Sequence, residues 1–89
     1  MYKNNEKIAG KFDLDNRLNQ LMEECAELIC VANHYRRGRV PRENVAEEMA
    51  DVRVVMEQVM GMIGVTEKDL RKIAEHKVKR TMERMEWLN

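Results

Sequence analysis

Residues 14–35, LDNRLNQLMEECAELICVANHY, decide the fold of this chain. Their apolar members recur alternately four and three positions apart, at Leu14, Leu18, Leu21, Cys25, Leu28, Ala32 and Tyr35. Such spacing places apolar side chains along one face of an α-helix. Asp13 is a suitable N-cap, and Gly38 follows the basic residues that favour a helix C-terminus. The stretch therefore predicts one long amphipathic helix that ends near residue 38.

A second helix is predicted after a short turn, because Pro41 suits the start of a helix. The same alternating spacing recurs along it, at Val45, Met49, Val52, Met56, Val59 and Ile63. Glycines at positions 61 and 64 place its end. Thr66 and Asp69 form a capping pattern that opens a third helix, with apolar residues at Leu70, Ile73, Val78, Met85 and Leu88. The sequence thus predicts an all-α fold, a helical hairpin plus a third helix.

Length and charge limit the classes of partner. A chain of 89 residues forms one small domain with a marginal core, so assembly into a multi-chain helical bundle is expected. Residues 1–12 are polar and aperiodic, and we expect a flexible N-terminal arm before a single helical domain at 13–89.

Lys plus Arg equals Asp plus Glu at 16 each, which argues against binding to a nucleic acid polymer or a membrane. No apolar run suits a membrane span or a signal peptide, so a cytoplasmic location is expected.

Two acidic pairs flank the apolar stripes of the predicted hairpin. A helical rotation of about 100° per residue places Glu24 and Glu27 to one side of the first apolar stripe. The same rotation places Glu48 and Asp51 to the same side of the second apolar stripe. In an antiparallel hairpin, all four carboxylates therefore lie on one side of the helix pair. The two acidic pairs also lie at similar distances from the turn. Four carboxylates gathered there would repel one another unless a divalent cation or basic groups compensate. Mg²⁺ prefers such oxygen ligands and commonly bridges them to phosphates, whereas a solvated acidic surface is the simpler alternative.

The motifs E23-E-C-A-E-L28 and E47-E-M-A-D-V52, about twenty residues apart, resemble those of the MazG-like all-α nucleoside triphosphate pyrophosphohydrolases. The resemblance covers roughly residues 13–85. It implies that Mg²⁺, for which Mn²⁺ substitutes, binds the four acids Glu24, Glu27, Glu48 and Asp51. It also implies hydrolysis of ribo- or deoxyribonucleoside triphosphates to monophosphate and pyrophosphate, by a homodimer or homotetramer. These four acids are then both the metal-binding and the catalytic residues.

The resemblance further implies substrate-binding residues on the later helix, Lys77 and Arg80 in K77-V-K-R80. Many relatives carry Lys one turn before the first acidic pair, where this chain has Gln20. By that position, a substrate contact is expected for Gln20 as well. Two other functions stay open. One is a phosphoribosyl-ATP pyrophosphohydrolase, and the other is a non-catalytic helical protein-interaction module.

Overall fold

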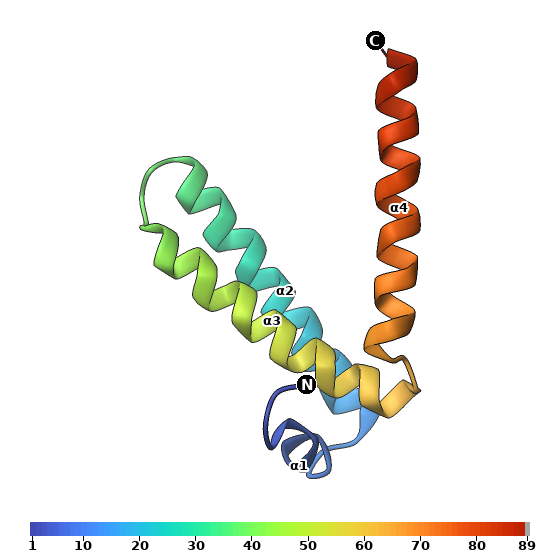
Figure 1. Cartoon of the computed structure of the whole chain (residues 1–89). Helices are drawn as coiled ribbons and strands as arrows, with labels where there is room; N and C mark the ends of the chain where they lie inside the picture. The colour runs from blue at the N-terminus through green and yellow to red at the C-terminus, as the bar shows by residue number, and fades with distance from the viewer. Residues whose placement is uncertain (89) are drawn as a thin grey trace.

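The computed structural model describes the backbone of residues 1–88 and the side chains of residues 1–86. It contains four helices, α1 (Asn5–Ala9), α2 (Leu14–Arg36), α3 (Arg42–Ile63) and α4 (Glu67–Leu88) (Figure 1). The predicted all-α fold is confirmed, and so are the three long helices. The expected place of Leu88 in the apolar stripe of the third helix lies outside the described side chains. None of the helices in the described part is both long and apolar enough to cross a membrane.

Local sequence signals fix the hairpin of α2 and α3. The Asp13 side chain accepts a hydrogen bond of 2.7 Å from the backbone N–H of Asn16, which caps the start of α2 as predicted. Gly38 follows the end of α2 with φ of 71°, a left-handed conformation that glycine adopts without steric cost. Pro41 then stands as the N-cap of α3. The short connection lets the two helices pack side by side in antiparallel directions (Figure 1).

The connection from α3 to α4 is a sharp change of direction. Gly64 ends α3 with φ of 75°. The backbone N–H of Thr66 donates to Asp69 Oδ2 over 3.0 Å, and the N–H of Asp69 donates to Thr66 Oγ1 over 3.1 Å. This reciprocal pair is the predicted cap, with Asp in place of the usual Glu. The backbone and side-chain hydrogen bonds with Thr66 hold the pKa of the Asp69 carboxyl below its usual value.

The described chain has a small core and an extended shape. Its buried hydrophobic residues are Ala9, Val55, Val59 and Met60. The radius of gyration is 16.0 Å, whereas a compact domain of this length has about 12 Å. The difference arises because α4 leaves the hairpin instead of packing along it (Figure 1). Assembly of several chains into a bundle stays a prediction.

The short helix α1 is held on α3 by a network of buried polar side chains. Asn5 Nδ2 donates to the backbone oxygen of Val54 over 3.0 Å and to Glu57 Oε1 over 3.3 Å. Gln58 Nε2 donates to Asn5 Oδ1 over 2.7 Å, and Arg17 Nη1 donates to Gln58 Oε1 over 2.9 Å. The network therefore links α1, α2 and α3 at the open end of the hairpin.

The sequence did not predict α1 or this network. The expected division into an arm of residues 1–12 and a domain of residues 13–89 stays a prediction. Within that arm, however, Asn5 and Ala9 are buried against the rest of the chain. A five-residue helix with no apolar repeat gives no periodic signal, and its stability here comes from hydrogen bonds to residues about fifty positions away.

Replacing Asn5 tests the network. Asn5→Ala should lower the free energy of unfolding by about 1–3 kcal/mol, because the buried Gln58 amide would lose the Asn5 oxygen that accepts its hydrogen bond. Glu57 would lose the Asn5 amide as a donor and keep the backbone N–H of Tyr2. Urea unfolding measures the loss, and hydrogen exchange of residues 1–12 should accelerate. Asn44→Ala is the matched control, since Asn44 is exposed at the start of α3. Equal stabilities of the two variants would contradict a structural role for the network.

Candidate metal centre

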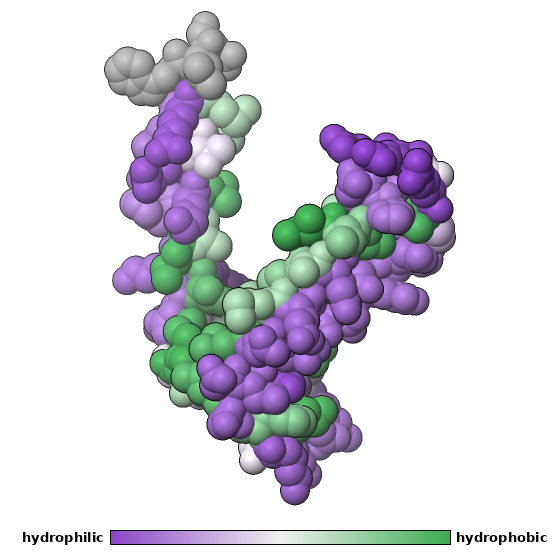
Figure 2. Space-filling view, turned by 180° about the vertical axis from the view of Figure 1, so that it is seen from behind, coloured by the Kyte–Doolittle hydropathy of each residue, from purple (hydrophilic) through white to green (hydrophobic). Residues whose placement is uncertain are grey.

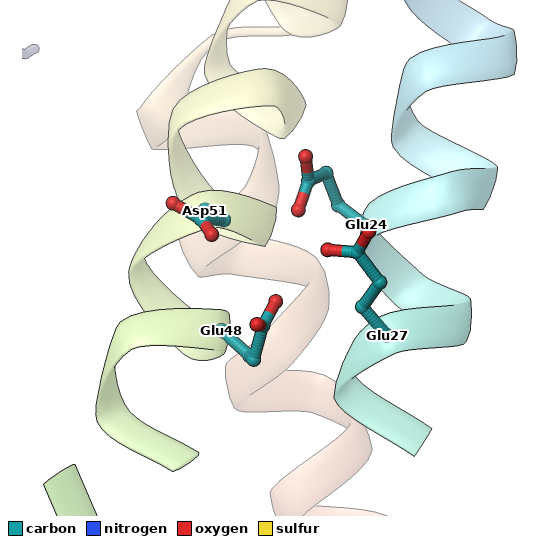
Figure 3. Close-up of side chains that lie close together, drawn as sticks. All are labelled: Glu24, Glu27, Glu48 and Asp51. Carbon is teal, nitrogen blue, oxygen red and sulfur yellow. The ribbon is translucent and has the colours of Figure 1, made fainter. Parts of the chain in front are cut away.

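Four carboxylates converge between α2 and α3. Glu24, Glu27, Glu48 and Asp51 each offer an oxygen, and these oxygens all lie within 4.8 Å of one another. Glu24 and Glu27 extend from α2 toward Glu48 and Asp51 on α3 (Figure 3). The structure thus brings together the four acids that the helical geometry predicted on one side of the hairpin. Each pair is spaced three residues apart, so both of its members project from one face of their helix.

Two of the carboxylates reach into the protein. Glu24 and Glu48 are half-buried, whereas Glu27 and Asp51 are exposed. Glu24 Oε2 and Glu48 Oε2 are buried and accept no hydrogen bond from any described residue. A buried carboxylate oxygen without a partner is costly, because it has lost water and gained nothing in return. One such oxygen lies on each helix, so a single bound cation could satisfy both.

The charges of the cluster act on one another. The pKa of Glu27 is raised above its ordinary value of 4.5, first by the negative charge of Glu24 and then by that of Glu48. Desolvation and hydrogen bonding to the same two carboxyls raise it further. Glu27 thus holds its proton more tightly than an isolated glutamate does, because its ionised form is repelled by nearby negative charge. A divalent cation among these groups would relieve the repulsion directly.

Gln20 lies one helical turn before Glu24 and contacts it. Gln20 Nε2 donates a hydrogen bond of 2.8 Å to Glu24 Oε1. The amide therefore fixes one oxygen of Glu24, while the other oxygen is left free and buried. Such a partner orients a ligand carboxylate in the manner of outer-shell groups at metal sites. The substrate contact expected for Gln20 stays a prediction, but its observed partner is an acid of the cluster.

Lys77 and Arg80 are exposed on α4, which leaves the hairpin. Among the described residues, the ion pair is Arg42 with Glu43 at 3.6 Å, and no Lys or Arg pairs with the four acids. A single chain therefore does not bring the two expected substrate-binding cations to the cluster. Their role in binding phosphate stays a prediction.

Arg17 and Gln58 were not singled out from the sequence, although they belong to the surroundings of the cluster. Arg17 is seven residues before Glu24, and Gln58 is seven residues after Asp51. Seven residues are nearly two turns, so each lies on the same side of its helix as the acid. Arg17 is only 8% exposed and stacks over the Phe12 ring at 4.0 Å. Polar residues repeated at this spacing are the signal that would have identified them.

A shallow depression adjoins the cluster on the side of the hairpin turn. It has a volume of about 400 Å³, and its lining residues are Ala26, Glu27, Cys30, Val31, His34, Val40 and Glu48. Two of the four acids therefore form one border of a mostly apolar surface. A ligand bound through its charged end at the acids would have apolar surface available for its other end.

The donor set suits a hard divalent cation. All four groups are carboxylates from two rigid helices, and Mg²⁺ and Mn²⁺ prefer such oxygens. The buried oxygens of Glu24 and Glu48 have no hydrogen-bond partner among the described residues, and this favours a bound cation. Carboxylates that are only part of a solvated acidic surface would give no such indication. No protein-family model, curated protein or solved structure matches this chain.

The raised pKa of Glu27 predicts a pH dependence of stability without metal. The folded chain holds this proton more tightly than the unfolded chain, so the free energy of unfolding should fall as pH rises from 4.5 through the raised pKa. Glu27→Gln should remove that decline, as measured by urea unfolding in EDTA across this range. Glu23→Gln should keep it, because Glu23 lies outside the cluster. The same decline in wild type and Glu27→Gln would contradict this origin.

Proposed function

We propose that this chain is a Mg²⁺-dependent nucleoside triphosphate pyrophosphohydrolase of the MazG-like type, which converts a ribo- or deoxyribonucleoside triphosphate to its monophosphate and pyrophosphate. The observation that carries the proposal is the convergence of four carboxylates, two of which have buried oxygens without a hydrogen-bond partner. The motif resemblance at Glu24–Glu27 and Glu48–Asp51 supports the choice of reaction.

The four acids hold the ion in this proposal, and Mn²⁺ substitutes for Mg²⁺. When bound, the ion supplies positive charge that neutralises the triphosphate and helps to position it. Phosphoanhydride hydrolysis needs no covalent nucleophile from the protein. Gln20 keeps Glu24 oriented through its 2.8 Å hydrogen bond. One of the four acids serves as the general base toward water.

The remaining contacts complete the substrate site. The depression beside Glu27 and Glu48 receives the nucleoside portion, since it is mostly apolar and borders the acids. Lys77 and Arg80 meet the phosphates in a homodimer or homotetramer. Mixed apolar and charged contacts of this kind are typical of small-molecule sites. A cytoplasmic location, and no nucleic acid polymer or membrane as partner, belong to the same proposal.

The reaction is tested by pyrophosphate release from a panel of ribo- and deoxyribonucleoside triphosphates, with Mg²⁺, with Mn²⁺ or with EDTA. Metal-dependent release from at least one of them is the expected result. Phosphoribosyl-ATP belongs in the panel, because exclusive release from it would replace the proposed substrate with that alternative. Absence of release together with absence of divalent-metal binding would favour the non-catalytic interaction module.

Substitution of one acid should remove turnover without unfolding the protein. Glu48→Gln should lower metal-dependent pyrophosphate release by about 100-fold or more, because an oxygen ligand becomes a neutral amide. Its metal-free thermal stability should equal or exceed that of wild type, since one repelling charge is gone. The matched control is Glu47→Gln, the adjacent residue outside the cluster, which should keep wild-type turnover. An equal loss of pyrophosphate release in both variants would contradict a specific role for the Glu48 carboxylate.

A further inference from the structure

Two cavities adjoin the N-terminal residue at the end of α3 that leads to α4, where the N-terminus of the chain lies (Figure 1). The first has a volume of about 300 Å³ and lies between α1 and α3. The second has a volume of about 280 Å³ and lies beside the connection from α3 to α4. Met1, Glu57 and Gly61 line both. Together the cavities fall in the range of about 300–1,000 Å³ that is typical of small-molecule sites.

The walls of the two cavities combine apolar surface with negative charge. Phe12 and Met62 contribute apolar surface to the first cavity, and Met60 and Val65 contribute it to the second. Hydrophobic residues also gather on the surface where α4 leaves the hairpin (Figure 2). The charged side chains among the described lining residues are all acidic, namely Glu6, Glu57 and Glu67. A ligand that matches these walls is therefore apolar and positively charged.

Glu57 is the most deeply buried of these acids, at 5% exposed. Its Oε1 accepts hydrogen bonds from the backbone N–H of Tyr2 over 2.8 Å and from Asn5 Nδ2 over 3.3 Å. Its Oε2 accepts none from the described residues, and no Lys, Arg or N-terminal amine among them pairs with it. A buried carboxylate without a cation is costly. Glu57 thus offers an unpaired charged oxygen to both cavities.

Gly61 leaves open the space beside Glu57. It lies inside α3, where glycine destabilises a helix relative to alanine. Its backbone does not need glycine, since the positive-φ glycines are Gly38 and Gly64. A Cβ built at Gly61 would meet no atom within 4 Å, so packing does not need glycine either. The missing side chain instead allows a bound molecule to approach α3 closely.

We propose that these cavities bind a small organic cation, in which an ammonium or amidinium group is attached to an apolar body. The cationic group donates to Glu57 Oε2, and the apolar body lies beside Gly61. Hydrogen bonds between such a cation and a carboxylate are stronger than those between neutral groups. Glu57 follows Glu48 by nine residues, which places it about 180° around α3. The site is therefore separate from the four-carboxylate cluster and does not depend on the proposed function.

Benzamidine is a suitable probe, because it carries an amidinium group on an apolar ring. Benzamide is its neutral counterpart, and benzoate is the anionic one. In NMR titrations of ¹⁵N-labelled protein, benzamidine should shift the side-chain amides of Asn5 and Gln58 and the backbone amide of Gly61. These shifts should saturate in the millimolar range expected of so small a ligand. Benzamide should bind at least about tenfold more weakly, and benzoate should not bind.

The absence of saturable shifts at Asn5, Gln58 and Gly61 would overturn the proposal. Equal affinities for benzamidine and benzamide would overturn it as well, because Glu57 would then not select for charge. Shifts of equal size at the backbone amides of Glu24 and Glu27 would also contradict it, since they would indicate general attraction to carboxylates.

Two variants test the assigned contacts separately. Glu57→Gln keeps an oxygen for the donors of Oε1 but loses the charge, and should weaken benzamidine binding by at least about tenfold. Glu83→Gln is the matched control, since Glu83 is an exposed acid of α4, and should bind like wild type. Gly61→Leu should stay helical by circular dichroism, because its Cβ meets open space, and should lose the shift at Asn5. Wild-type affinity in Glu57→Gln or in Gly61→Leu would overturn the proposal.

Discussion

Repulsion among the four carboxylates is the interaction on which the rest of the structure depends. Glu24, Glu27, Glu48 and Asp51 come together because α2 and α3 are long, antiparallel and joined by a short turn. The same packing that brings the stripes of the hairpin into contact forces the acids against one another, as the raised pKa of Glu27 records. A chain with such a small core keeps this arrangement only if something offsets it. A divalent cation is the simplest group that does so.

The polar residues around the cluster fix the positions of its carboxylates but do not neutralise their charge. Gln20 donates to Glu24 without adding charge. Two turns away, Arg17 is engaged by Asn16, Gln58 and the Phe12 ring, so its charge is directed away from the acids. Asn5 and Gln58 then connect this end of the hairpin to α1. The polar contacts therefore fix the two helices relative to each other, while none of the four acids pairs with a Lys or Arg among the described residues.

Much of this could be predicted from the sequence, because the decisive signals are local and periodic. The alternating apolar spacing gave the three long helices, and Asp13, Gly64 and the Thr66–Asp69 pair marked their ends. Helical rotation placed all four acids correctly. The helix α1 could not be predicted, since its stability comes from side chains distant in sequence. The direction of α4 was equally hidden, because an amphipathic stripe does not indicate which surface will cover it.

In our proposal, carboxylates of both α2 and α3 bind one divalent cation. Anomalous diffraction from crystals grown with Mn²⁺ tests it most directly. We expect a manganese peak between the two helices, with oxygens of Glu24, of Glu48 and of at least one of Glu27 and Asp51 at about 2.1–2.2 Å from the ion. A crystal at millimolar Mn²⁺ with no peak there, or with the ion held by other residues while the four carboxylates face solvent or cationic side chains, would contradict it.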